Sequence, residues 1–141
     1  MRTFVLGTFV LSLVACTAID VRPAQNLSSS TPVCIINNPA VIVDDFVDVV
    51  RDGFNRHGIP TSVVDQSDAK TCEVTLTYTA LRSWDLAPYL SHAELRLWRN
   101  GAQVGFAQYH LKGKGGYSLA KWKGTKSKMD PVVDQLLGGV Q

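Results

Sequence analysis

Three histidines are the side chains of this sequence best suited to acid–base chemistry or metal binding: His57, His92 and His110. None belongs to an HExxH pattern, and the sequence has no GxSxG or CxxC motif. In the hairpin predicted from this sequence, His92 lies opposite Tyr109 and His110 opposite Ser91, so the two rings point to opposite faces and cannot share a metal ion. His57 lies at the C-terminus of a predicted helix, where a capping role is the simpler interpretation. We therefore expect no enzyme activity, no catalytic residue, no metal and no cofactor.

The run Lys112-Gly113-Lys114-Gly115-Gly116 is a second candidate, because glycine-rich loops can bind phosphate. It lacks the spacing of a P-loop and follows a hairpin strand instead of opening a strand–helix unit. A bend in the backbone is the simpler role for these glycines.

A basic segment stands out from the rest of the chain. Between Lys112 and Lys128 there are six lysines and no acidic residue. Such a segment could contact anionic lipid headgroups, glycan phosphates or an acidic protein, and the alternative is a solvated loop with Trp122 buried against the sheet. The formal charge of the whole chain is only +2, so we expect no nucleic-acid partner. The predicted anionic-ligand surface consists of Lys112, Lys114, Lys121, Trp122 and Lys123.

The first fifteen residues have a different composition. Met1-Arg2 gives a short basic start, an apolar run extends from Thr3 to Val14, and the small residue Ala15 precedes Cys16. This pattern predicts a signal peptide over residues 1–15. A transmembrane helix is the alternative, but the run is shorter than the roughly 20 apolar residues that a spanning helix needs.

The sequence Leu13-Val14-Ala15-Cys16 resembles the lipobox of bacterial lipoproteins, in which a diacylglyceryl group is attached to the cysteine before cleavage leaves that cysteine first. The resemblance implies a permanent lipid anchor on Cys16 that carries palmitate-like acyl chains. Thr17 follows where an Asp would favour the inner membrane of enteric bacteria, so the resemblance also implies an outer-membrane protein that faces the periplasm. An ordinary signal peptide with a cysteine near its cleavage point is the alternative.

A lipid on Cys16 leaves Cys34 and Cys72 as a pair in an oxidising compartment, which implies a disulfide between them. Two buried free thiols are the alternative. Metal binding is a weaker interpretation, because neither residue has a Cys or His nearby at ligand spacing.

Hydrophobic periodicity predicts the elements that position these residues. Residues 33–36 and 61–64 have the composition of short strands, and 65–71 that of a loop. Between the strands, a helix is expected to begin at Asn38-Pro39 and to end at Gly58. Its apolar stripe consists of Val43, Phe46, Val47, Val50 and Phe54.

The remainder of the chain is predicted to be mostly β. Alternation predicts strands over 74–80 and 93–98, with Pro88 interrupting the stretch between them. Asn100-Gly101 predicts a tight hairpin that pairs Leu97 with Val104 and Leu95 with Phe106. A final helix over 129–137 contains Pro131, which would bend or begin it, and stops at Gly138-Gly139.

We therefore predict an α+β domain with one mainly antiparallel sheet of about five strands, covered on one face by two helices, in the order strand-helix-strand-strand-strand-strand-helix. This single periplasmic domain occupies residues 33–141, and residues 16–32, with two prolines and three consecutive serines, form a lipidated tether. The layout resembles the amino-terminal domain of TolB. The segment from Lys121 to Leu137 also resembles a group of uncharacterised proteobacterial outer-membrane lipoproteins, for which no catalytic residue is implied.

Two functional hypotheses follow. The first is a non-enzymatic lipoprotein of the cell envelope that acts as a binding or assembly accessory for an envelope protein partner, through sheet edges and loops. The second is a direct binder of anionic lipid or glycan through the segment from Lys112 to Lys128. A hydrolase is disfavoured because no nucleophile, base and orienting residue are recognisable together. The sequence leaves the oligomeric state open.

Overall fold

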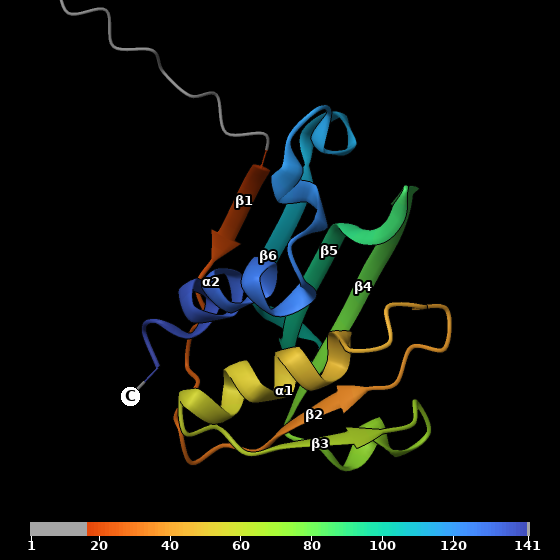
Figure 1. The fold of residues 1–141 in the computed structure, drawn as a ribbon. Helices are drawn as coiled ribbons and strands as arrows, with labels where there is room; N and C mark the ends of the chain where they lie inside the picture. Colours follow the sequence, from red (N-terminus) through yellow and green to blue (C-terminus); the bar gives the residue numbers. More distant parts are fainter. Residues whose placement is uncertain (1–16, 141) are drawn as a thin grey trace, which may run out of the picture.

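The structure of the protein is a computed structural model that describes residues 17–140. It is an α+β fold with one six-stranded sheet and two α-helices, as Figure 1 shows. The strands are β1 (Thr17–Arg22), β2 (Val33–Ile36), β3 (Thr61–Val64), β4 (Val74–Asp85), β5 (Ala87–Arg99) and β6 (Ala102–Leu111). The α-helices are α1 (Phe46–Arg56) and α2 (Thr125–Leu137), and three short 3-10 helices are η1 (Asp68–Thr71), η2 (Lys112–Gly115) and η3 (Leu119–Trp122).

The sheet is mixed, with the strand order β1-β6-β5-β4-β2-β3. The pairs β1–β6, β6–β5 and β5–β4 are antiparallel, whereas β2 is parallel to both of its neighbours. The predicted fold class and the two helices are confirmed, but the expected mainly antiparallel sheet of about five strands is only roughly right. Helix α1 carries the chain across the sheet between β2 and β3, and such a crossover makes the two strands parallel.

The sixth strand comes from the segment that we expected to be a tether. Residues Thr17–Arg22 form β1 and pair with β6 from Leu111 to Phe106. The chain after β1 also packs on the domain, because the Ala24 N–H donates to the Leu136 carbonyl at 2.8 Å and Leu27 is buried. The described part of this stretch is therefore part of the domain, whereas the sequence predicted a lipidated tether over residues 16–32.

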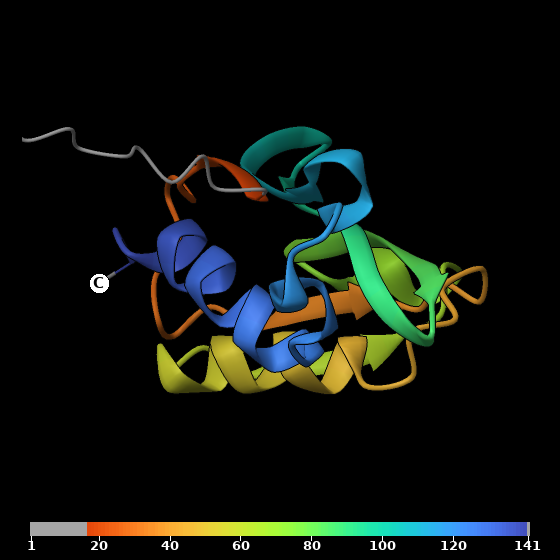
Figure 2. The same cartoon turned by 45° about the horizontal axis from the view of Figure 1, so that its top comes forward.

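Helices α1 and α2 lie side by side on one face of the sheet, as Figures 1 and 2 show. The core between helices and sheet includes fully buried Phe46, Phe54, Leu95, Leu97 and Met129. Gly53 of α1 faces Val133 of α2 so closely that a Cβ atom on Gly53 would lie 2.6 Å from the Val133 Cγ1. The two helices therefore meet at a point that admits only glycine without movement of the valine.

Helix α1 begins later than the sequence predicted. It starts at Phe46, whereas Asn38 lies in a turn and its side-chain amide donates to the Tyr78 carbonyl at 2.9 Å. Its end matches the prediction: Gly58 has a φ of +72° directly after the cap residue His57. Helix α2 includes Pro131 and extends from Thr125, four residues before the predicted helix, to Leu137.

The hairpin at Asn100-Gly101 forms with positive φ at both residues, as a tight turn requires. The predicted pairing is wrong by one residue: Leu97 pairs with Gly105 and Leu95 with Ala107, because the register shifts between Leu97 and Trp98. An irregularity of this kind moves every later side chain of β6 to the other face. Phe106 consequently leaves the core side.

Phe106 instead lies under the guanidinium groups of Arg22 and Arg96, at 5.1 and 4.7 Å from the ring centroid. Residues 65–71, predicted to be a loop, contain the 3-10 helix η1. None of the helices within residues 17–140 is long and apolar enough to cross a membrane.

Candidate functional site

The register shift changes the position of two histidines. His92 and His110 are direct partners on β5 and β6, with their Nδ1 atoms 3.2 Å apart, and the His92 Nε2 lies 3.3 Å from a Glu94 carboxylate oxygen. Our prediction that these rings point to opposite faces is therefore wrong. Within residues 17–140, no group of three His, Cys, Asp or Glu residues is arranged to hold a metal ion. His57 lies at the end of α1, where its Nε2 is 2.9 Å from the Asp134 carboxylate.

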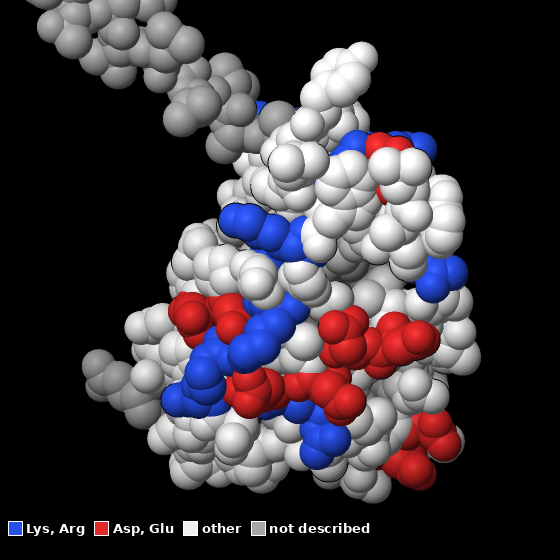
Figure 3. All heavy atoms as spheres, in the orientation of Figure 1, with Lys and Arg blue, Asp and Glu red and all other residues white. Residues whose placement is uncertain are grey.

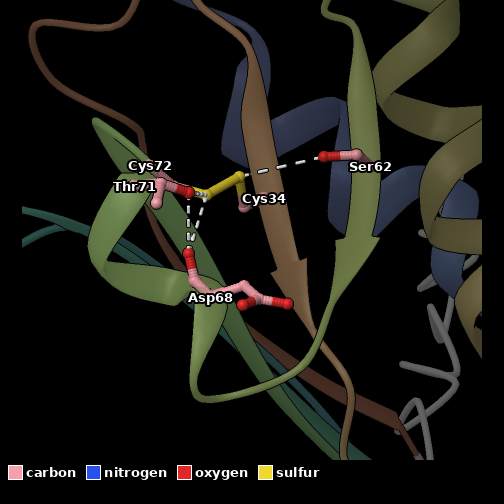
Figure 4. Close-up of a disulfide and its surroundings, with 5 residues drawn as sticks. All are labelled: Cys34, Ser62, Asp68, Thr71 and Cys72. Atoms are coloured by element: carbon pink, nitrogen blue, oxygen red, sulfur yellow. Dashed lines mark hydrogen bonds between the residues drawn. A yellow bond between two sulfur atoms is a disulfide. The ribbon is translucent and has the colours of Figure 1, made fainter.

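The structure contains the expected disulfide. Cys34 of β2 is bonded to Cys72, which lies between η1 and β4, with the two Cα atoms 6.2 Å apart (Figure 4). The loop that it closes contains α1 and β3. Cys16 lies outside the described residues, so its lipidation remains a prediction.

The six lysines of the basic segment separate into two groups of three. Lys126 is held in ion pairs to Asp52 at 2.6 Å and to Asp130 at 3.0 Å. The hydrogen bond to Asp52 is the largest cause of a raised pKa for Lys126. Lys121 and Lys128 are each only 5% exposed. These three therefore have partners inside the protein, although Lys126 is also exposed. The exposed lysines that form no ion pair with the described residues are Lys112, Lys114 and Lys123.

Lys128 is buried beneath the β5 side of the sheet. Its Nζ donates to the Leu90 carbonyl at 2.9 Å and to the Lys121 carbonyl, and it lies 5.4 and 5.9 Å from the ring centroids of Tyr89 and Tyr109. Burial lowers the pKa of Lys128 to about 8. Lys128 therefore links β5 to the segment around Lys121 by hydrogen bonds inside the protein and is not available to an external ligand.

Lys121 connects two loops that are far apart in the sequence. Its Nζ forms an ion pair with Asp85, at the turn between β4 and β5, and donates to the Gly116 carbonyl at 2.8 Å. The Trp122 indole N–H donates to the Asp85 carbonyl at 2.7 Å. Lys121 and Trp122 are thus part of the scaffold, in contrast to the predicted role of both as ligand-contacting residues. We call this joined structure, residues 81–89 and 112–123, the tip.

The tip lies at the end of the sheet where the described chain begins. Thr17, the first residue of β1, pairs with Leu111, which directly precedes the tip residue Lys112. The same end contains the turn where β4 passes into β5, as Figure 1 shows. Cys16 lies outside the described residues but is joined to Thr17 by one peptide bond, and such a bond separates consecutive Cα atoms by about 3.8 Å. The predicted lipid attachment site is therefore a neighbour of the tip.

The tip also carries most of the exposed large hydrophobic side chains. Of eight such residues in the described chain, five belong to the tip, which makes it the main apolar surface there. They are Leu81 (53% exposed), Trp84 (73%), Leu86 (86%), Tyr117 (106%) and Leu119 (78%). None of these five belongs to the anionic-ligand surface that the sequence predicted. The sequence does contain a signal for the exposure of Trp84 and Leu86, which is their proximity to Pro88. A proline marks a strand end, where neighbouring side chains can be exposed.

A hollow of about 540 Å³ adjoins the tip and is bordered by residues of β4, β5, β6 and η2. It is open to solvent and has basic and neutral polar groups on its walls, with no acidic side chain among them. The lining residues are Leu81, Arg82, Ser83, Ser91, His92, Gln108, His110, Leu111 and Lys114.

Comparisons with known proteins identify a structural likeness. No family model and no curated protein matched the chain. The PelC dodecamer from Paraburkholderia phytofirmans, crystallised in space group P6, matches with a TM-score of 0.61 over 85% of this chain and 97% of the PelC chain, at 11% identity. A single-substitution variant of the same dodecamer, in space group C2, matches with a TM-score of 0.61 over 85% of this chain and 98% of that one, at 13% identity. At such identities the comparison shows that this chain shares its fold with PelC.

Proposed function

We propose that this chain is a lipid-anchored lipoprotein of the cell envelope, attached through Cys16 to the outer membrane with its domain in the periplasm. In this proposal it acts without catalysis, as a binding or assembly accessory. The observation that carries the proposal is the position of β1, which begins one residue after Cys16 and is paired with β6 over its whole length. A lipid on Cys16 would then join the sheet directly to the bilayer, and the domain would remain at the membrane surface.

Lipidation is tested by replacing Cys16. We expect wild-type protein, expressed in a bacterium with an outer membrane, to incorporate an alkyne-labelled palmitate and to fractionate with that membrane. Cys16→Ser should lose the label and accumulate as uncleaved precursor, because processing depends on the lipid-modified cysteine. The double variant Cys34→Ser/Cys72→Ser is the matched control and should keep the label. Label retained by Cys16→Ser would refute the anchor.

The open edge of β3 supports the assembly part of the proposal. β3 is the last strand of the sheet, and Ser62 and Val63 on it are exposed. An edge strand has unpaired backbone groups that can pair with a partner. The PelC structures are dodecamers, so a chain of this fold can take part in an assembly. We extend this property to the present chain and propose that the β3 edge meets a second copy or another envelope protein.

Site-specific cross-linking tests this contact. A photo-reactive amino acid at Val63 should give a cross-linked product in intact cells, whose mass distinguishes a second copy from a different protein. The control is the same reagent at Ser127, which is exposed on α2, away from β3. Equal products from the two positions, or none from Val63, would refute a role for the β3 edge.

A further inference from the structure

We infer that the tip is a second membrane contact, which binds the surface of a bilayer with anionic headgroups and orients the domain on it. This inference rests on the proposed anchor at Cys16, because the anchor is what brings the tip to a membrane. The first supporting observation is position: Cys16 is bonded to Thr17, and Thr17 pairs with the residue that leads into the tip. Any bilayer that holds a lipid on Cys16 therefore lies within reach of the tip.

The second observation is the chemistry of the exposed side chains. Trp84 and Tyr117 are of the type that collects at membrane interfaces, where an aromatic ring meets headgroups and upper acyl chains. Leu86 and Leu119, both more than three-quarters exposed, add aliphatic surface to them. Exposed apolar side chains that gather in one region of a protein often mark a site of protein, ligand or membrane binding. The apolar part of the tip therefore matches the interfacial region of a bilayer.

The third observation is charge. Four exposed cations accompany the apolar side chains: Arg82, Lys112, Lys114 and Lys123. The one acidic residue of the tip, Asp85, is already paired with Lys121. Figure 3 shows most of the acidic side chains of the visible face over the lower half, where α1 and α2 lie. A negatively charged surface is consequently attracted to the tip more than to α1 and α2, which carry equal numbers of acidic and basic residues.

The adjoining hollow provides a place for a headgroup. Arg82 and Lys114 can pair with a phosphate there, whereas the Ser83 hydroxyl already donates to Ser91 and the Ser91 hydroxyl to the Leu81 carbonyl. Leu81 and Leu111 give the same hollow apolar surface. The combination of cations and aliphatic side chains favours an anionic phospholipid at the edge of a bilayer over a neutral one.

The backbone at Leu86 indicates that the exposed leucine has a role other than folding. Its φ is +61°, a conformation that glycine and asparagine adopt more readily than leucine. The side chain is 86% exposed and therefore makes little contribution to the core. A residue that is poorly suited to its backbone and contributes little packing is best explained by an external contact.

The test uses a chain that begins at residue 17, which retains every strand and helix described above and lacks the predicted lipid site. We would measure co-sedimentation with vesicles of phosphatidylcholine alone and with 30% phosphatidylglycerol, at low and at physiological salt. We expect binding to the anionic vesicles that weakens with salt, and weak binding to the neutral ones. The triple variant Lys112→Gln/Lys114→Gln/Lys123→Gln should bind more weakly by up to about fivefold for each lysine.

Leu86→Asn separates binding from folding. Asparagine accepts positive φ, so the variant should melt at or above the wild-type temperature while its vesicle binding falls severalfold. Trp84→Ser should lower binding in the same way. The matched controls are Lys70→Gln in η1 and Lys126→Gln on α2, which alter exposed basic side chains away from the tip and should bind as wild type does.

Three results would overturn the inference: no binding to anionic vesicles at low salt, unchanged binding by Leu86→Asn together with the lysine variant, or equal loss in the controls. Inhibition by millimolar glycerol 1-phosphate with no vesicle binding would assign the tip to a free phosphate compound, which also contradicts a bilayer contact. None of these results depends on Cys16. A failure here therefore leaves the anchor standing, and failure of the palmitate labelling leaves the vesicle result interpretable.

Discussion

At the scale of single residues, the basic segment shows how identical side chains acquire different roles from their surroundings. Lys128 and Lys112 look equivalent in the sequence, yet one is an internal donor to two carbonyls and the other is exposed. A charge loses its hydration when it is buried, so carbonyl oxygens and aromatic faces have to replace the water. Lys128 has both kinds of partner, and its pKa is still lowered to about 8.

This lowered pKa predicts a dependence of stability on pH. Between about pH 8 and the ordinary lysine value of 10.5, the unfolded chain holds a proton on Lys128 that the folded chain has released. The free energy of unfolding should therefore rise with pH across this window, by about 3 kcal/mol in total at 1.36 kcal/mol per pKa unit. We would measure urea unfolding of wild type and Lys128→Met from pH 7 to 10.5 and compare the two slopes.

The variant should lack the rise, so the difference between the two curves is the informative quantity. Burial raises the pKa of Tyr109 to about 12. The free energy of unfolding therefore falls above pH 10 in both proteins, and this shared contribution largely cancels in the difference between the two curves. Parallel curves for wild type and Lys128→Met would show that the lysine titrates normally in the folded protein.

The sequence predicted where the exposed basic residues gather more reliably than it predicted which residues they contact. The sequence identified Lys112, Lys114 and Lys123 as basic and close together, and they are exposed. It could not show that Lys121 is paired with Asp85, because that contact spans 36 residues and depends on how two loops fold against each other. The exposure of Trp84 and Leu86 likewise depends on how the hairpin of β4 and β5 lies against the rest of the fold, so the sequence did not predict it.

At the scale of elements, the contact between α1 and α2 depends on one glycine. Gly53 is buried, and the side chain of Val133 occupies the space where a Cβ would lie. Helix propensity alone would favour alanine over glycine in the middle of α1 by about 1 kcal/mol. Glycine at position 53 allows the two helices to approach each other, so the packing of α1 against α2 outweighs helix propensity at this position.

Gly53→Ala should therefore destabilise the protein, by about 1 to 3 kcal/mol, because the added methyl group forces Val133 or the helix to move. Val133→Ala leaves a cavity and should also destabilise. In the double variant the two changes compensate, so the loss should be smaller than the sum of the single losses. Thermal and urea unfolding give the three values.

The matched control is Gly139→Ala, since a Cβ there would meet no atom within 4 Å. It should change stability by less than about 0.5 kcal/mol. If the double variant loses the full sum of the two single losses, the proposed steric conflict between Gly53 and Val133 is absent.

The disulfide closes a unit of consecutive elements, because Cys34 and Cys72 enclose α1 and β3 over a separation of 38 residues. Cys34→Ser/Cys72→Ser should lower the free energy of unfolding by roughly 3 to 4 kcal/mol, in line with the chain entropy of a loop of that length. Oxidised wild type, unfolded without reductant, should expose no free thiol at either position. Alkylation of both cysteines under these conditions would contradict the bond, and wild type treated with reductant should melt like the double variant.

Element boundaries and pairing registers were the weakest part of the prediction. The strand–helix–strand order of residues 33–64 already implied a parallel pair, because a helical crossover returns the chain in the same direction. The irregularity between Leu97 and Trp98 has no such signal: whether one residue is left out of the pairing depends on packing across the sheet. That single residue decided which face His110 and Phe106 occupy.

At the scale of the whole molecule, the fold places different surfaces at different ends. The tip is apolar and basic, the helix side carries the ion pairs of Lys126 and Arg56 with the acidic residues of α1 and α2, and β3 leaves one edge of the sheet open. Hydrophobic periodicity could predict the core and the two helices that cover it. It could not predict this distribution, which arises from how the strands are ordered.

The direction of β1 has a mechanical consequence. A lipid on Cys16 would transmit any pull of the membrane to Thr17, at the end of the strand, and along the strand axis. The hydrogen bonds between β1 and β6 lie perpendicular to that axis and extend over six residue pairs. A pull along the strand axis would load these hydrogen bonds together in shear, whereas a pull perpendicular to the strand would break them one after another. With no flexible linker between Thr17 and the sheet, a domain anchored through Cys16 would follow the sliding and tilting of the bilayer as one rigid body.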